Sequence, residues 1–133
     1  MTRFALMTAA LILAAGPVLA AACGAGGDGM TVIEYETGVT ALSAEDKARL
    51  ATFAETAKFR DAVCIFAQVD AQGSEAANVQ VAEGRAKTVE RYLVSQGVPE
   101  DRILIAKQEE AFTFFGLLPD NRSNDRRVTV TYE

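Results

Sequence analysis

Hydrophobic residues recur at the spacing of an α-helix in two segments of the chain. The first segment follows Ser43, a good helix N-cap, and has acidic residues in its first turn. The second covers residues 76–95 and is closed by Gly97 and Pro99. The hydrophobic stripes are Leu50, Phe53, Ala54 and Ala57 in the first segment, and Ala82, Ala86, Val89 and Leu93 in the second. Each spacing predicts a helix that buries one face.

Four other segments are rich in β-branched and aromatic residues and predict strands at residues 30–37, 61–70, 102–107 and 127–132. The second of these is hydrophobic at consecutive positions through Phe66, as in a strand that is buried on both faces or covered at one end. In the last one, two valines alternate with Thr129 and Thr131, so the valines and the threonines lie on opposite faces. The order of elements, β-α-β-α-β-loop-β, predicts an α/β two-layer sandwich of the α+β type.

Residues 1–22 have the layout of a secretory signal peptide. A short basic start is followed by a hydrophobic run at residues 4–15, a break at Pro17 and then small residues. A membrane-spanning helix needs about 20 hydrophobic residues, and this run is shorter and ends at the break. We therefore expect the protein to be exported from the cytoplasm.

The residues around Cys23 leave two modes of cleavage open. Residues 20–23 resemble the lipobox of bacterial lipoproteins, whose cysteine is lipidated, although Ala20 stands where that motif favours leucine. By the same resemblance, Gly24 implies sorting to the periplasmic face of the outer membrane, with the glycine-rich residues 23–29 as a flexible tether. Ordinary cleavage would instead leave a soluble periplasmic protein.

The cysteine count bears on the same choice, because Cys23 and Cys64 are the two cysteines of the chain. If Cys23 is lipidated, Cys64 is a single thiol in hydrophobic surroundings, and we expect it to be buried and inert. If Cys23 keeps its thiol, the oxidising periplasm allows a disulfide bond between the two.

The composition excludes several classes of function. The chain has no histidine, which rules out histidine-based catalytic triads, the HExxH zinc motif and imidazole acid–base catalysis near neutral pH. With two cysteines and no histidine, a four-ligand structural zinc site is not expected. The formal net charge of −5 makes the chain a poor partner for nucleic acid phosphates. We therefore expect no enzymatic activity, no metal ion and no cofactor.

Short motifs along residues 35–132 resemble the OmpA-like peptidoglycan-binding domain. They occur in the family's order and spacing, and the family's turn after the second strand is represented by Asp70 and Gly73. The other matches are Leu42-Ser43, Asn78, Arg85-Ala86, Tyr92-Leu93, Gly97-Val98, Arg102-Ile103 and Asp125-Arg126-Arg127-Val128. The resemblance implies a mixed four-stranded sheet in a domain at residues 30–133. The signal peptide, the cysteine and the short tether are similar in layout to Pal-type lipoproteins.

The resemblance implies that the domain binds the diaminopimelate residue of the peptidoglycan stem peptide without catalysis. One carbon of that side chain carries an ammonium and a carboxylate, so the site requires an acid and a base close together. Asp70 suits the ammonium, and Arg85 can hold the carboxylate through two parallel hydrogen bonds. By resemblance, Asn78 and Arg127 flank this pair. Anchored through a lipid on Cys23, such a module would tether the outer membrane to the cell wall. A structural role also stays open, in which Asp70 caps the turn and pairs with Arg85.

Two departures from the family favour a second function. The family has Gly-His-Thr before the aspartate, whereas this chain has residues 67–69 as Ala-Gln-Val, and residues 107–110 lack the family's glycines. The loop at residues 111–119 has five large hydrophobic side chains, Phe112, Phe114, Phe115, Leu117 and Leu118. This loop either folds back on the sheet as a lid or offers an exposed patch to an envelope protein partner. The alternative function is therefore a protein-interaction module with a decayed peptidoglycan site.

Overall fold

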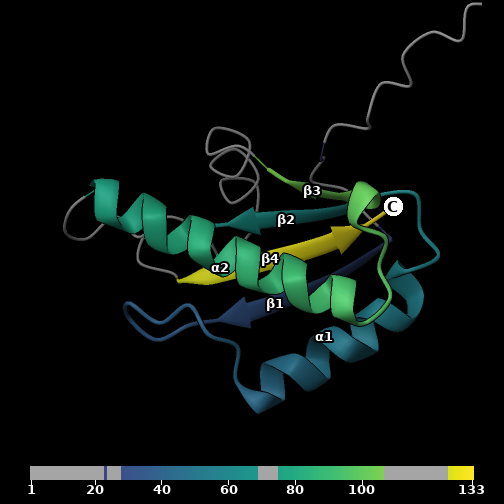
Figure 1. Cartoon of the computed structure of the whole chain (residues 1–133), viewed down its shortest axis with the longest axis horizontal. Coiled ribbons are helices and arrows are strands. Elements are labelled where there is room, and N and C mark those ends of the chain that lie inside the picture. The colour runs from purple at the N-terminus through teal and green to yellow at the C-terminus, as the bar shows by residue number, and fades with distance from the viewer. Residues whose placement is uncertain (1–22, 24–27, 69–74, 107–125) are drawn as a thin grey trace, which may run out of the picture.

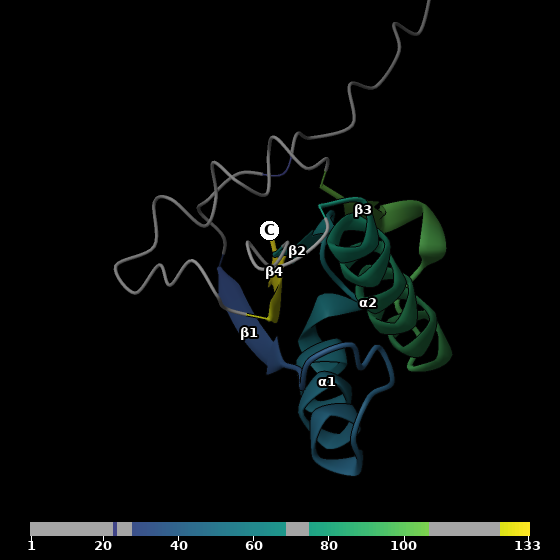
Figure 2. The same cartoon turned by 90° about the vertical axis from the view of Figure 1, so that its left-hand side faces the viewer.

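The computed structural model describes residue 23 and residues 28–68, 75–106 and 126–133. In these ranges a four-stranded sheet forms one layer and two α-helices form the other, both against the same face of the sheet (Figure 1 and Figure 2). The elements are β1 (Gly29–Glu34), α1 (Ala44–Ala57), β2 (Val63–Ala67), α2 (Glu75–Ser95), the short 3-10 helix η1 (Glu100–Arg102), β3 (Ile103–Ile105) and β4 (Arg127–Tyr132). The predicted two-layer sandwich is confirmed.

The C-terminal strand β4 lies inside the sheet, between β1 and β2, and β3 forms the edge beyond β2. β4 runs antiparallel to both of its neighbours, whereas β2 and β3 are parallel, so the sheet is mixed as expected. β1 and β2 therefore run in the same direction and end on the side of the molecule where β4 begins (Figure 1). α2 also starts at that end of the sheet.

Both predicted hydrophobic stripes are buried. Their eight residues are each at most 9% exposed, and they pack in one cluster with the inner face of the sheet. Ser43 caps α1, since its side-chain oxygen accepts a hydrogen bond of 3.1 Å from the backbone N–H of Asp46. Gly97, with a φ of 98°, takes the left-handed conformation that follows the end of α2.

β1 and β3 are shorter than the sequence indicates. β1 ends at Glu34 because its partner in β4 is Arg127, the first residue of that strand. The chain then turns, and the Val39 N–H donates to the Glu36 carbonyl at 3.1 Å. β3 begins at Ile103 because residues 100–102 form the 3-10 helix.

The face of the sheet opposite the helices is buried as well. Cys64 and Phe66 of β2 and the two threonines of β4 point to this side by strand alternation, and each is at most 3% exposed. Every residue of β2 is buried, which confirms the prediction of a strand covered on both faces. Among the described residues, the partly buried Cys23 and Leu104 pack against this side.

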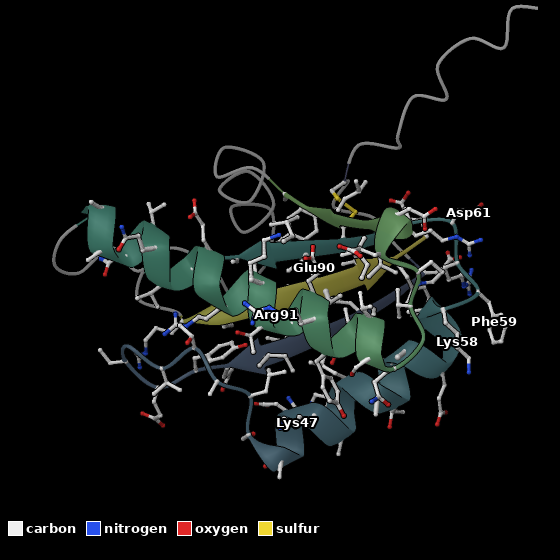
Figure 3. All side chains as sticks on the ribbon, viewed as in Figure 1. Lys47, Lys58, Phe59, Asp61, Glu90 and Arg91 are labelled. Atoms are coloured by element: carbon white, nitrogen blue, oxygen red, sulfur yellow. A yellow bond between two sulfur atoms is a disulfide. The ribbon has the colours of Figure 1, made fainter. Side chains whose placement is uncertain are left out.

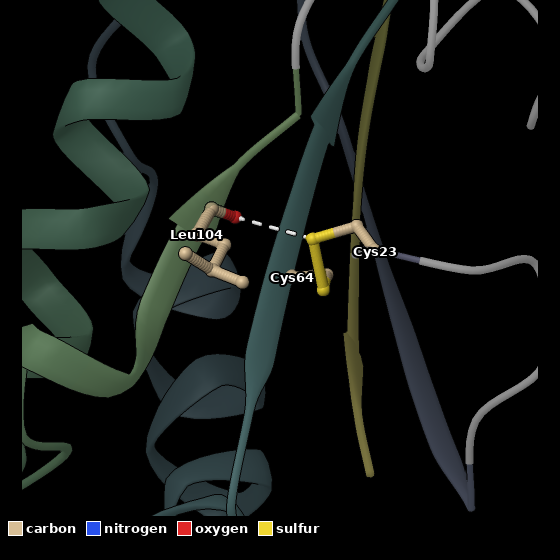
Figure 4. The surroundings of a disulfide bond; sticks show 3 residues. All are labelled: Cys23, Cys64 and Leu104. Atoms are coloured by element: carbon tan, nitrogen blue, oxygen red, sulfur yellow. Dashed lines mark hydrogen bonds between the residues drawn. A yellow bond between two sulfur atoms is a disulfide. The ribbon is translucent and has the colours of Figure 1, made fainter. Parts of the chain in front are cut away.

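Cys23 is joined to Cys64 by a disulfide bond, with the two Cα atoms 5.6 Å apart (Figure 4). The Cys23 sulfur also lies 3.9 Å from the Leu104 carbonyl oxygen of the adjacent strand. A sulfur atom in a disulfide cannot carry the thioether of a lipid. This structure therefore corresponds to the bridged alternative, and the lipidation of Cys23 stays a prediction from the motif. The motif around residue 23 contained no signal of where this sulfur packs in the fold.

Several predictions fall outside the described residues. These are the signal peptide at residues 1–22, most of the tether, Asp70 with its turn, and the hydrophobic loop at residues 111–119. The limits of the signal peptide and of the domain therefore stay predictions. In the ranges that the structure describes, no helix is long and hydrophobic enough to cross a membrane.

Truncating Leu93 should destabilise the fold much more than truncating its neighbour Val94. Leu93 is fully buried, so Leu93→Ala should lower the free energy of unfolding by about 2–5 kcal/mol. Val94 is 37% exposed, and Val94→Ala should change this free energy by roughly 0.5 kcal/mol or less. Urea unfolding followed by circular dichroism measures both values. Equal losses would mean that α2 does not bury the stripe described above.

Candidate functional site

Three elements meet where β1 and β2 end and β4 begins. The residue after β1 and the residue after β2 each donate a backbone N–H to the entry of β4. These bonds join Tyr35 to the Arg126 carbonyl and Gln68 to the Arg127 carbonyl, both at 2.9 Å. α2 starts from the same end (Figure 1) and carries two of the predicted site residues, Asn78 near its start and Arg85 at its middle. The predicted site residues within the described ranges, Asn78, Arg85 and Arg127, are therefore carried by elements that start at this end of the molecule.

Arg85 is buried although it carries a full positive charge, with 2% of its surface exposed. Its Nε donates to the Val39 carbonyl at 2.9 Å, and its Nη2 donates to the Glu36 carbonyl at 3.1 Å. The guanidinium also lies over the Tyr35 ring, with Cζ 4.9 Å from the ring centroid. Arg85 therefore braces α2 against the segment after β1, through contacts that the sequence did not indicate.

Tyr35 is a neighbour of Arg85 that the sequence analysis missed as a site residue. It is 6% exposed, and its hydroxyl has no hydrogen-bond partner among the residues that the structure describes. Burial first, and the Asp46 carboxylate second, raise the pKa of the phenol well above its ordinary value, while the Arg85 guanidinium lowers it. The phenol is therefore neutral at physiological pH and can donate a hydrogen bond. Strand alternation could have found it, because Tyr35 shares a face with the buried Ile33.

Two adjacent arginines at the start of β4 point in opposite directions. Arg127 is the first residue of the strand, and alternation puts its side chain on the face of the two threonines, away from the helices. Arg126 donates its Nε to the Tyr35 carbonyl at 3.1 Å and lines a recess beside α1. Of the two, Arg126 shares a neighbour with Arg85, whereas the resemblance pointed to Arg127.

The recess beside Tyr35 has a volume of about 500 Å³ and lies between the end of β1 and the start of α1. Its charged residues are Glu34, Glu36, Glu45, Asp46, Arg49 and Arg126. Arg49 is held there by hydrogen bonds to the Val32 carbonyl at 2.9 Å and to the Glu45 carboxylate at 3.3 Å. Because carboxylates outnumber guanidinium groups, the lining favours a cationic group such as an ammonium.

Of the two remaining predicted site residues, Asn78 is described by the structure and Asp70 is not. Asn78 is partly exposed and lies about two helical turns before Arg85, so both are on the same side of α2. Asp70 lies outside the described residues, and its pairing with Arg85 stays a prediction. In the described part of the chain, no three acidic or cysteine side chains gather closely enough to hold a metal ion.

Three solved structures are similar to this one. The peptidoglycan-associated lipoprotein from Burkholderia pseudomallei is 19% identical, with a TM-score of 0.56 over 77% of this chain and 89% of that chain. The OmpA-like domain of FopA1 from Francisella tularensis subsp. tularensis SCHU S4 is 14% identical, with a TM-score of 0.54 over 77% and 72%. An outer membrane protein from Borrelia burgdorferi B31 is 20% identical, with a TM-score of 0.53 over 77% and 85%. At these identities the likeness shows a shared fold.

No curated protein sequence matches the chain. The model of the OmpA family matches residues 34–126. This match starts at the last residue of β1 and ends just before β4, so it contains Tyr35, Arg85 and Arg126. Because it spans more than half of the sequence, this chain belongs to the OmpA family.

Proposed function

We propose that this protein is a non-catalytic binding module of the cell envelope that recognises peptidoglycan through the diaminopimelate residue of the stem peptide. The chain belongs to the OmpA family, and one structure with the same fold is a peptidoglycan-associated lipoprotein. The observation that carries the proposal is the position of Arg85, which is buried and oriented at the end of the sheet from which the chain runs on to Asp70.

Asp70 is the acid that the proposed site requires. It follows Gln68 by two residues, so covalent geometry keeps its Cα within about 7 Å of the Gln68 Cα. The Gln68 N–H donates a hydrogen bond to the Arg127 carbonyl, at the end of the sheet where Arg85 lies. A carboxylate there would accept hydrogen bonds from the diaminopimelate ammonium. The negative lining of the recess beside Tyr35 adds attraction for the same cation.

Arg85 is the base of the proposed site. Its bonds to two main-chain carbonyls hold the guanidinium in one orientation before the ligand arrives, so less side-chain entropy is lost on binding. Burial also lowers the local dielectric, which strengthens a hydrogen bond to the ligand carboxylate. By family resemblance, Asn78 and Arg127 flank this pair.

Tyr35 and Arg126 extend the proposed site beyond the residues expected from the sequence. A buried hydroxyl without a partner among the described residues costs stability, and a ligand carboxylate or amide would supply the missing acceptor. Arg126 is fixed by its bond to the Tyr35 carbonyl and brings a second cation to the same side of the sheet.

A tether between the outer membrane and the wall requires a membrane attachment as well as wall binding. In this structure the Cys23 sulfur is occupied by the bond to Cys64. We therefore limit the proposed function to binding the wall in the periplasm, without a lipid link to the membrane.

The alternative is a protein-interaction module that uses the loop at residues 111–119, which lies outside the described residues. The observation that favours it is the change at Gln68, which stands two residues before Asp70, where the family has histidine. Gln68 is 8% exposed, so this change alters the buried support of the site. Failure to bind peptidoglycan would favour this alternative.

Recognition of diaminopimelate predicts selective binding to one type of cell wall. The protein should co-sediment with sacculi whose stem peptides contain diaminopimelate, and much less with sacculi that contain lysine, which lacks the side-chain carboxylate. Asp70→Asn should weaken binding roughly tenfold to hundredfold, because a hydrogen bond to a charged group contributes about 1.5–3 kcal/mol. Sedimentation over a range of sacculus concentrations measures the affinity.

Asp61→Asn is the matched control for the loss of one negative charge. Asp61 is exposed and lies at the opposite end of the molecule from the start of α2, so this variant should bind like the wild type (Figure 3). Equal binding by the Asp70 and Asp61 variants would contradict the proposed site. A wild-type protein that sediments with neither type of wall would contradict the proposed function.

Arg85→Ala should reduce stability as well as binding. The change removes the donors of two buried carbonyl bonds and the cation over the Tyr35 ring, so the free energy of unfolding should fall by about 3–5 kcal/mol. Urea unfolding of the purified variant gives this value. Wild-type stability combined with lost binding would show that Arg85 serves the ligand and does not brace the fold.

Tyr35 should make the stability of the protein sensitive to alkaline pH. Its pKa is raised in the folded protein, whereas in the unfolded chain it has the ordinary value of about 10. Above this pH the unfolded chain loses the proton and the folded protein keeps it. The free energy of unfolding should then fall by up to about 1.4 kcal/mol per pH unit through this group.

Tyr35→Phe removes this contribution and provides the comparison. Below pH of about 10 the variant should be as stable as the wild type or more stable, because the hydroxyl without a partner is gone. Above it, the wild type should lose stability relative to the variant. Guanidinium unfolding of both proteins at neutral and alkaline pH measures the difference. Parallel curves would show that the phenol is not shielded from solvent.

A further inference from the structure

We propose that Cys23 serves in the mature protein as the disulfide partner of Cys64, and that the chain consequently works in the periplasm without a lipid anchor. The inference concerns how the module is held and does not depend on what it binds. It rests on the disulfide bond together with three features of the fold: the direction of Cys64, the length of chain that reaches it, and the packing of Cys23.

Cys64 faces the side of the sheet that the helices leave open. It belongs to the inner strand β2, paired with Thr131 of β4 on one side and Leu104 of β3 on the other. Its neighbours Val63 and Ile65 belong to the core cluster under the helices, so alternation turns the Cys64 side chain to the opposite face. The sulfur is therefore presented where a segment that precedes β1 can lie against the sheet.

The segment before β1 is long enough to reach Cys64. Two contacts fix Asp28 at the start of β1. Its backbone N–H donates a hydrogen bond of 3.0 Å to the Tyr132 carbonyl, and its carboxylate forms an ion pair of 2.7 Å with Arg60. From β1 the chain must cross β4 to reach β2, a distance of two strand spacings or about 10 Å. The steps from Asp28 back to Cys23 span up to about 17 Å. The disulfide bond between Cys23 and Cys64 can therefore form without displacing β1.

Cys23 is packed as part of the fold. It is partly buried and lies against Leu104 and the cluster of Cys64, Phe66 and Ala106 (Figure 4). A lipid on the same sulfur would separate Cys23 from Cys64 and draw residue 23 towards a membrane surface. The buried Cys64 thiol and the Phe66 ring would then lose this cover.

Formation of the bond is a two-electron oxidation that suits the periplasm. Each cysteine thiol gives up a proton, a sulfur–sulfur bond forms, and two electrons pass to the disulfide of a periplasmic dithiol oxidase, which is reduced to its dithiol. Lipidation would instead replace the S–H bond of Cys23 with a carbon–sulfur bond. The two modifications exclude each other on one chain, so the chemical state of Cys23 decides where the protein is held.

The test is the state of Cys23 in the full-length precursor produced in a Gram-negative host. After free thiols are trapped with an alkylating agent, we expect the wild-type protein in the osmotic-shock fraction. No cysteine should be alkylated before reduction, and both should be alkylated after it. Mass spectrometry of the mature chain should show the loss of two hydrogens and an N-terminus that precedes Cys23.

The variant Cys64→Ser shows whether Cys23 is lipidated when it has no disulfide partner. By the inference, this variant stays in the osmotic-shock fraction, and Cys23 becomes a thiol that can be trapped. A wild-type chain that begins at an acylated Cys23 and remains with the membranes would overturn the inference, and so would two trappable thiols in the wild type. A bridged, lipid-free protein that does not bind sacculi would contradict the proposed function and leave this inference standing.

Discussion

The pairing of β4 with both β1 and β2 is the constraint on which the rest of the structure depends. β4 lies between β1 and β2, and it connects the first strand of the fold to the inner strand β2. Its register sets Val128 opposite Ile33 and Val130 opposite Ile65, under the helices. A slip of one residue would turn the two threonines into that core and the valines out of it. The end of the sheet with Tyr35 and Arg126 therefore takes shape only when β4 pairs with both of its neighbours.

Arg85 shows how a charged residue can be held inside a small fold. A buried cation loses hydration, and a hydrophobic side chain of similar volume is often as good or better for stability. Two main-chain carbonyls and the face of the Tyr35 ring offset part of that cost. The arrangement is understandable if the charge is needed for a ligand. The same contacts that make the arginine tolerable in the core also fix the orientation of its guanidinium group.

The sequence predicted the periodic features of the fold and missed those that depend on contacts between distant segments. The helix stripes and the two faces of β4 follow from local spacing, and the structure confirms them. The carbonyl partners of Arg85 have no signature, because any residue at positions 36 and 39 supplies the same main-chain oxygen. A shift of one residue in the pairing of β4 would exchange the faces of the sheet to which Arg126 and Arg127 point. To predict which arginine lies near Arg85, one must therefore know at which residue β4 begins to pair.

Gly29 shows that a glycine in a glycine-rich segment can be required by the packing of the sheet. Glycines before a domain are typical of a flexible tether, but Gly29 is already paired with Tyr132 in the sheet, and a Cβ at this position would overlap the Tyr132 ring. Its glycine is therefore required by packing. Asp28 also forms an ion pair with Arg60, and Cys23 is joined to Cys64 by a disulfide bond. The disulfide therefore links the chain before β1 to the inner strand β2 of the sheet.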